Sequence, residues 1–405
     1  MRYLLIGVLL LVSFSTVFSV QAITLEDAEK IFLENNLELK AKKADIGKYD
    51  AAVLEAGLLP NPVFKYNIES VENGRRETEE IYSVSQPVDI VRKRGLRKDL
   101  ALKKRDAEQL HYEQDARNAL AELKKTYYRV LYLTENQEAV KGIYDAFSDL
   151  RQKTEERLKA GDVAEVELLK LAGESNRFLR ALENLKAEID IEKRKLALML
   201  NIGMEEIALQ ESFTPAAGYT QGDLISKALE KRADIQAASA RLDAAGHALA
   251  LSRKEAVSPI EIEAGYKRLT GGFNGFAFGV SIPFPLFNKN QGGIAAAKAE
   301  LEADRLRLEQ IKKKTANEVA EQTARAEFID SRLSHLTSQL KTAEEITISI
   351  RTAYDEGEVS LIELLDAVRS RRELLMEYNE TVYDYWATLF ELEKTTGMKL
   401  AGGAE

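Results

Sequence analysis

The order of hydrophobic and polar positions along the chain predicts two kinds of element, long helices and short strands. Between Gly95 and Lys159, apolar residues recur at three- and four-residue spacing, as at Leu120, Leu123, Tyr127, Val130 and Leu131. This spacing is typical of a helix that packs along one side. Such a helix would extend roughly 100 Å at ~1.5 Å per residue, so it must find neighbours along its whole length.

Four short segments alternate between apolar and polar residues instead. In the first of them, Phe64, Tyr66 and Ile68 share one face, and the residues between them are polar. A period of two indicates a strand rather than a helix. We therefore expect strands at about 63–70, 80–88, 260–268 and 276–283.

The pattern of elements occurs twice. Gly357 lies 196 residues after Gly161, and each glycine is followed by an acidic residue and a valine at the turn between two helical runs. The same spacing relates Val84-Ser85-x-Pro87 to Val280-Ser281-x-Pro283. Agreement at one offset predicts an internal duplication. We expect two repeats, each ordered helix, strand, strand, long helix, turn and helix, over residues 23–215 and 216–405.

The N-terminus has the composition of an export signal. Arg2 precedes an apolar run from Leu4 to Val20, and Val20-Gln21-Ala22 fits a small-x-small cleavage site. We expect Met1–Ala22 to be removed. The alternative is an uncleaved anchor, although the apolar run is shorter than the ~20 residues of a spanning helix. Because the chain has no Cys, it has no disulfide framework and no cysteine for lipid attachment.

Composition excludes several classes of function. Charged residues make up 30% of the chain and prolines number only 7, which suits long amphipathic helices. The net charge of −9 disfavours nucleic acid as a partner. His111, His247 and His335 lie too far apart in sequence to suggest a metal site, and no phosphate-binding loop or nucleophile–base motif is present. We therefore expect no enzyme activity, no cofactor and no bound metal.

The strands need a partner for their apolar faces. Two strand pairs cannot bury those faces by themselves, and the helices are too amphipathic to supply a core. In an exported chain, the apolar faces can meet lipid if the strands close into a barrel. Four strands are too few to surround a lumen, so several chains would have to combine. The alternative is a β-layer packed on the helices of a soluble periplasmic protein.

The duplicated plan, the export signal and the glycine-centred tips resemble the outer membrane efflux protein family typified by TolC, over essentially the whole mature chain. Three motifs are similar to the heavy-metal cation efflux (CzcC/CusC-like) branch of that family. They are Leu59-Pro60-Asn61-Pro62, Ser85-Gln86-Pro87 with Arg92-Lys93-Arg94-Gly95, and the segment from Pro283 to Gly293, which reads PFPLFNKNQGG.

The resemblance implies a mainly α fold with a transmembrane β part. Three copies would form a hollow α-helical barrel across the periplasm and one shared outer-membrane β-barrel, with four strands from each chain. The implied partners are two further copies, outer-membrane lipid, a periplasmic adaptor and a proton-driven inner-membrane pump of the RND type. The implied cargo is heavy-metal cations. The alternatives are an exit duct for organic compounds or secreted polypeptides, and a soluble periplasmic coiled-coil scaffold.

The resemblance also implies two kinds of site. Glu363 and Asp366, three residues apart on the last helix, correspond to the acidic residues of the family's periplasmic gate. A solvated helix face is the alternative, and the equivalent residues of the first repeat, Glu167 and Lys170, do not form an acidic pair. The second kind is contact with the adaptor at the tips, where plain chain reversal is the alternative. The tip residues are Gly161, Asp162, Val163, Gly357, Glu358 and Val359.

Overall fold

The computed structural model describes residues 22–72, 76–215 and 223–400. The expected export signal Met1–Ala22, except its last residue, and the loop residues 73–75 lie outside this range. In the described part of the chain, no helix is both long enough and apolar enough to cross a membrane.

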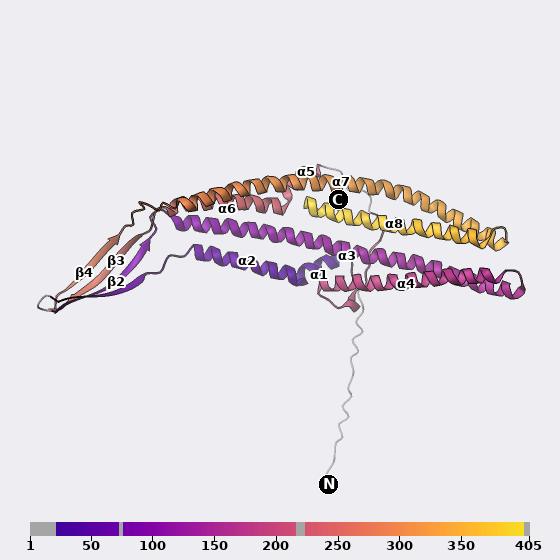
Figure 1. The fold of residues 1–405 in the computed structure, drawn as a ribbon, viewed down its shortest axis with the longest axis horizontal. Helices are drawn as coiled ribbons and strands as arrows, with labels where there is room; N and C mark the ends of the chain where they lie inside the picture. Colours follow the sequence, from indigo (N-terminus) through magenta and orange to yellow (C-terminus); the bar gives the residue numbers. More distant parts are fainter. Residues whose placement is uncertain (1–21, 73–75, 216–222, 401–405) are drawn as a thin grey trace, which may run out of the picture. The chain divides into compact units, whose positions relative to one another are not determined.

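The order of helices and strands is duplicated, as expected (Figure 1). The long helices contain 68 and 66 residues, and the return helices contain 36 residues each. The first set comprises α1 (Leu25–Asn35), α2 (Leu37–Ala56), β1 (Val63–Glu72), β2 (Arg76–Val88), α3 (Lys93–Ala160) and α4 (Glu165–Leu200). After the short helix η1 (Met204–Glu206), the second set comprises α5 (Leu224–Lys231), α6 (Ala233–Glu255), β3 (Ile260–Leu269), β4 (Asn274–Ser281), α7 (Gln291–Glu356) and α8 (Leu361–Thr396).

The first helix of each repeat is broken, which the sequence pattern did not predict. Asn36 interrupts the first and caps α2, because its side chain accepts a hydrogen bond from Leu39 N at 3.0 Å. Arg232 interrupts the second, and its guanidinium bonds to Asp234 and, at 2.7 Å, to Glu318 of α7. The breaks lie 196 residues apart, so the interruption is itself part of the repeat.

The four strands form one antiparallel sheet in the order β1-β2-β3-β4, so β1 and β4 are its edges. Pairing of β2 with β3 joins the two repeats. β4 ends at Ser281, two residues earlier than expected, before Pro283, which has no N–H to donate to a ladder. The register places four aromatic residues in one row across the sheet, namely Tyr66, Tyr82, Tyr266 and Phe276.

The chain packs as two compact units, and the boundary between them crosses α3 after Tyr128. The first unit takes its described residues from 1–34 and 129–213. Its core includes the rings of Phe147 in α3 and Phe178 in α4, whose centroids lie 5.1 Å apart. Ile23 N donates to Ala208 O at 2.7 Å, which ties the first described residues to the segment after α4.

The second unit takes its described residues from 35–128 and 214–405 and contains the sheet. In it, α8 runs back along α7, and α6 packs on the earlier part of α7 (Figure 1). An aromatic cluster joins α3 to α8, because the Tyr128 ring lies 4.6 Å from that of Trp386 and 5.2 Å from that of Phe390. Of the apolar stripe predicted on α3, Leu123 and Tyr127 are buried in this unit, and Val130 and Leu131 are buried in the first unit.

Candidate functional site

The turn between α7 and α8 is built by a glycine and a capping box. Gly357 ends α7 with φ of +79°, a conformation that side chains disfavour, and its N–H bonds to the carbonyls of Ala353 and Tyr354. Ser360 then caps α8. Its backbone N–H donates to the Glu363 carboxylate at 2.7 Å, while Glu363 N donates to the Ser360 hydroxyl. The glycine and the capping box together turn the chain between α7 and α8.

The two residues expected at a gate, Glu363 and Asp366, are both exposed on α8. The structure gives them separate partners. The Glu363 carboxylate closes the capping box, whereas Asp366 lies 3.5 Å from Arg369 one turn later. Neither partner was expected for these two carboxylates, although the Ser-x-x-Glu pattern is typical of a capping box. Within one chain, therefore, the Glu363 carboxylate is bonded to the N-cap residue, and the charge of Asp366 is partly compensated by a cation.

The tip between α3 and α4 has the same backbone but a weaker cap. Gly161 has φ of +86°, close to the value at Gly357. Ala164, the counterpart of Ser360, has no side chain able to cap α4. Both tips present an exposed acidic residue, Asp162 or Glu358, next to a half-buried valine, Val163 or Val359. Because an N-cap contributes about 1 kcal/mol, the first tip is the less strongly fixed of the two.

Ion pairs cross between α7 and α8 above the tip. Arg371 of α8 lies 3.0 Å from Glu344 of α7, and Arg332 of α7 lies 2.9 Å from Glu377 of α8. These side chains are partly exposed, so each pair contributes at most about 1 kcal/mol. Their effect is to hold the register of the two helices near the proposed gate.

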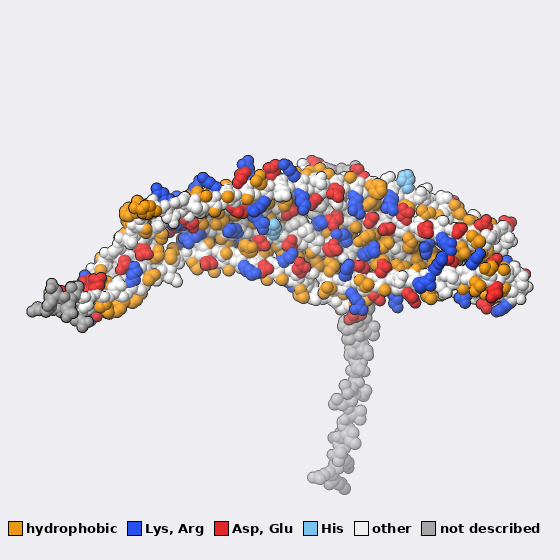
Figure 2. Space-filling view, in the orientation of Figure 1, with side chains coloured by type: hydrophobic (Ala, Val, Ile, Leu, Met, Phe, Trp, Pro, Cys, Tyr) orange, Lys and Arg blue, Asp and Glu red, His pale blue; other side chains and the backbone are white. Residues whose placement is uncertain are grey.

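One face of the sheet is apolar and open to the surroundings. Phe276 and Phe278 of β4 are 81% and 82% exposed. The register places on their face further exposed apolar residues of the other strands, namely Phe64, Tyr66, Ile68, Tyr82, Val84, Ile262 and Tyr266. In Figure 2, hydrophobic side chains lie along the lower edge of the strand region, and charged side chains lie across the face that the view shows. A contiguous apolar surface of this kind suits contact with lipid.

The opposite face of the sheet is polar and carries ion pairs between strands. Lys65 of β1 lies 3.0 Å from Glu263 of β3, across β2, and Lys267 of β3 pairs with Glu79 of β2. Lys65 and Glu263 are 198 residues apart, so the sequence pattern assigned them to polar faces without pairing them. The sheet therefore has one face for lipid and one for water.

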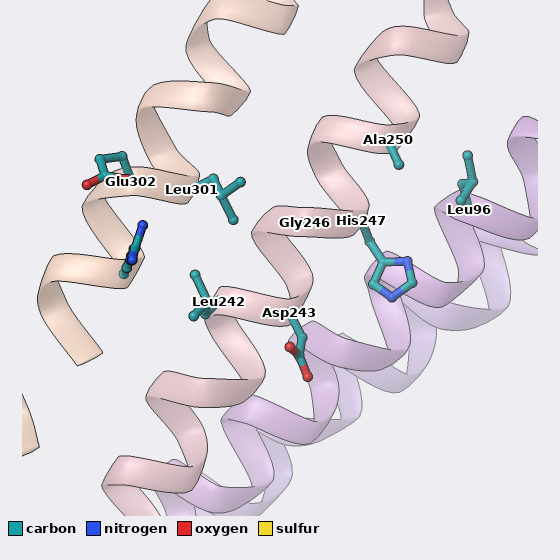
Figure 3. A pocket seen from close by; sticks show the side chains of 9 residues that line it. Leu96, Leu242, Asp243, Gly246, His247, Ala250, Leu301 and Glu302 are labelled. Carbon is teal, nitrogen blue, oxygen red and sulfur yellow. The ribbon is translucent and has the colours of Figure 1, made fainter. Parts of the chain in front are cut away.

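A shallow groove between α3, α6 and α7 contains His247 (Figure 3). Its lining is mostly apolar, including Leu96, Leu242 and Leu301. The acidic neighbour one turn before His247 on α6 is Asp243, which lies 4.0 Å from Lys103 of α3. Among the described residues, no three His, Asp or Glu side chains are placed to share a cation.

A two-faced sheet joined to long helical hairpins defines a membrane-inserted channel protein. The model of the outer membrane efflux protein family matches residues 30–201 and 224–397, which is most of the chain. The chain therefore belongs to the outer membrane efflux protein family. Members of this family are non-enzymatic transport ducts, and the location is the outer membrane with a periplasmic helical part.

Relatives agree with this membership. The cobalt-zinc-cadmium resistance protein CzcC of Cupriavidus metallidurans is 23% identical over 365 residues, covering 88% of this chain and 85% of the relative. The solved structure of CusC, described in terms of transmembrane channel formation, has a TM-score of 0.78 at 16% identity over 92% of both chains. The outer membrane protein VceC of Vibrio cholerae has a TM-score of 0.76 at 15% identity, covering 93% of this chain and 96% of its own. The two structural likenesses show the fold.

Proposed function

We propose that this protein is the outer-membrane exit duct of a tripartite efflux system that exports heavy-metal cations. The proposed cargo rests on the similarity to CzcC over 88% of the chain, since CzcC is named for cobalt, zinc and cadmium resistance. In this proposal, the duct is passive. A proton-driven inner-membrane pump of the RND type supplies the energy, and a periplasmic adaptor joins pump and duct.

The proposed assembly is a homotrimer. In the described chain, β1 and β4 each pair on one side only, so the sheet has two free edges. Free edges in lipid leave backbone N–H and C=O groups without partners, which is costly. Pairing β4 of one copy with β1 of the next would remove these edges. Three copies would then enclose a lumen lined by the polar face, with Lys65, Glu263, Lys267 and Glu79 turned toward water.

The proposed gate is formed by Glu363 and Asp366 at the periplasmic end. In a trimer these residues would give two stacked acidic rings, which attract cations and repel one another unless cations are present. Glu363 lies in the first turn of α8, where the positive end of the helix dipole also favours its negative charge. Arg369 would moderate the ring of Asp366.

The proposed adaptor contacts are the two tips. Each offers an exposed acidic side chain beside a half-buried valine, at Asp162 and Val163 and at Glu358 and Val359. Because the glycine at each turn has no side chain, a partner could contact the backbone of the turn directly. Because only the second tip has a side-chain cap, we propose that the two tips have different roles, with the second next to the gate.

The proposal is tested by the resistance profile of a strain from which the gene has been deleted. We expect sensitivity to divalent heavy metals, including cobalt, zinc and cadmium, and restoration by the wild-type gene. Growth on organic toxins should change little. Sensitivity to organic toxins alone would contradict the proposed cargo while leaving the channel intact. Recovery of the protein from the soluble periplasm would contradict the assembly.

A further inference from the structure

A basic pocket lies where the sheet meets the helices, between the end of α2, the end of β2 and the start of α3. Its lining includes three cationic side chains, an acid and two apolar residues, namely Arg92, Arg94, Lys98, Asp89, Leu59 and Val88. We name it the junction pocket. It contains part of the Arg92-Lys93-Arg94-Gly95 motif, and the proposed export function assigns no role to this motif.

The three cationic side chains of the junction pocket outnumber its one acid, Asp89. No Asp or Glu oxygen of the described residues lies within ion-pair distance of Arg92, Arg94 or Lys98, whereas farther along α3 Arg105 lies 2.7 Å from Asp106. Arg92, Arg94 and Lys98 are all exposed, so an anion from outside the chain can reach them. Such an anion would neutralise their charge.

The acid of the junction pocket already has a different function. The Asp89 carboxylate accepts the backbone N–H groups of Val91 at 3.2 Å and Arg94 at 3.0 Å. Burial works to raise its pKa, but the N–H groups of Arg94, Val91 and Lys93 hold the pKa below its usual value. Asp89 is therefore the anion that caps the start of α3. The cationic side chains, and not the helix end, remain available to a ligand.

Exposed apolar residues lie beside lining residues of the pocket along the chain. Leu58, Leu59 and Ile90 are exposed, and Leu59 is part of the lining. Beyond them lies the apolar face of the sheet, which continues from Val84 to Tyr82 along β2. The surface thus changes from cationic to apolar over the junction. This order matches an amphiphile whose charged group lies at the membrane boundary and whose chains lie in the lipid.

We propose that the junction pocket binds the phosphate group of an anionic glycerophospholipid, such as phosphatidylglycerol, in the periplasmic leaflet of the outer membrane. Arg92, Arg94 and Lys98 would donate to the phosphate oxygens, since guanidinium groups match phosphate geometry in paired hydrogen bonds. The acyl chains would lie along the apolar face of the sheet. A zwitterionic lipid would bring its own cation to the pocket and bind less well. This inference rests on the outer-membrane location and on no part of the proposed cargo.

The test is native mass spectrometry of the purified full-length protein in detergent. Phosphatidylglycerol and phosphatidylcholine with the same acyl chains are titrated separately. The test variant is R92Q/R94Q/K98Q, and the matched control is K312Q/K313Q/K314Q, which removes the same charge from an exposed basic run on α7. We expect retention of phosphatidylglycerol to fall about tenfold or more in the test variant, the scale of losing a charge-assisted contact, and to stay unchanged in the control.

A second variant distinguishes loss of the contacts to phosphate from misfolding of the first variant. R92K/R94K keeps the charge but loses the paired geometry, so we expect an intermediate loss of phosphatidylglycerol, with unchanged circular dichroism. Equal binding of the two lipids by the wild-type protein, or equal losses in the test and control variants, would overturn the inference. Binding of inorganic phosphate without retention of phosphatidylglycerol would also overturn it, since the pocket would then bind free phosphate and not a lipid.

Discussion

Lys124 of α3 and Glu393 of α8 form a buried ion pair, with Nζ 2.8 Å from Oε2 and each side chain only 9% exposed. The pair joins the first repeat to the second across 269 residues of sequence. Glu393 also accepts the backbone N–H of Leu400 at 2.7 Å, and the Lys124 ammonium lies 5.5 Å from the centre of the Phe390 ring. The pair therefore fixes the end of α8 and the residues that follow it.

Breaking this pair on one side should be costly. K124M leaves Glu393 buried without its cation, and we expect a loss of about 3–5 kcal/mol in the free energy of unfolding. The measurement is thermal or denaturant unfolding followed by circular dichroism in detergent. K124M/E393L replaces both charges and should recover most of the loss. If K124M alone unfolds like the wild-type protein, the pair does not stabilise the fold.

The left-handed conformation of Gly357 predicts a second effect. G357V places a β-branched residue at φ of +79°, where the backbone is strained by about 1–2 kcal/mol, and should distort the tip. We expect weaker export with normal amounts of protein in the outer membrane, measured by metal resistance and by fractionation. G142V, at an open position within α3, is the control and should export normally. Normal export by G357V would mean that the tip is only a turn.

The two faces of the sheet predict opposite tolerance of charge at neighbouring positions. F278K puts an ammonium on the apolar face and should destabilise insertion by about 2–4 kcal/mol if the site lies near the bilayer midplane. A277K puts the same charge on the polar face and should insert normally. The readout is the yield of heat-modifiable protein in outer-membrane fractions. Equal yields from the two variants would remove the distinction between the faces.

The proposed gate is best tested without disturbing the cap. E363Q/D366N removes both charges, and Gln at position 363 can keep the hydrogen bond to Ser360 N. We expect weaker block by multivalent cations in planar-bilayer recordings of single channels. E167Q, the equivalent change in the first repeat, should leave the block unchanged. A double variant that is blocked like the wild-type channel would place these residues outside the gate.

Much of the fold could be predicted because its signals are periodic. The apolar stripe on α3, the alternation around Phe64 and the repeated glycines at Gly161 and Gly357 each follow from local geometry. The breaks at Asn36 and Arg232 could not be found in the same way. The apolar pattern continues through both residues. At Arg232 the backbone is extended, and the side chain pairs with Glu318, far away in sequence.

The sites were less predictable than the fold. The sequence places Glu363 and Asp366 on one helix, but not the hydrogen bond that fixes Glu363 or the cation beside Asp366. The junction pocket could not be predicted from the sequence, because Leu59, Asp89 and Lys98 come together only when α2, β2 and α3 meet. Pairs such as Lys65 with Glu263 depend on strand order, which alternation alone does not give.

If this chain carries heavy-metal cations out of the cell, the loss of zinc from loaded cells must depend on it. The most direct test is zinc efflux from preloaded cells that lack the chromosomal gene and express the wild-type protein, G357V or no protein. We expect rapid loss of zinc with the wild-type protein and slow loss in the other two strains. Equal rates of zinc loss in all three strains would show that this chain does not export zinc.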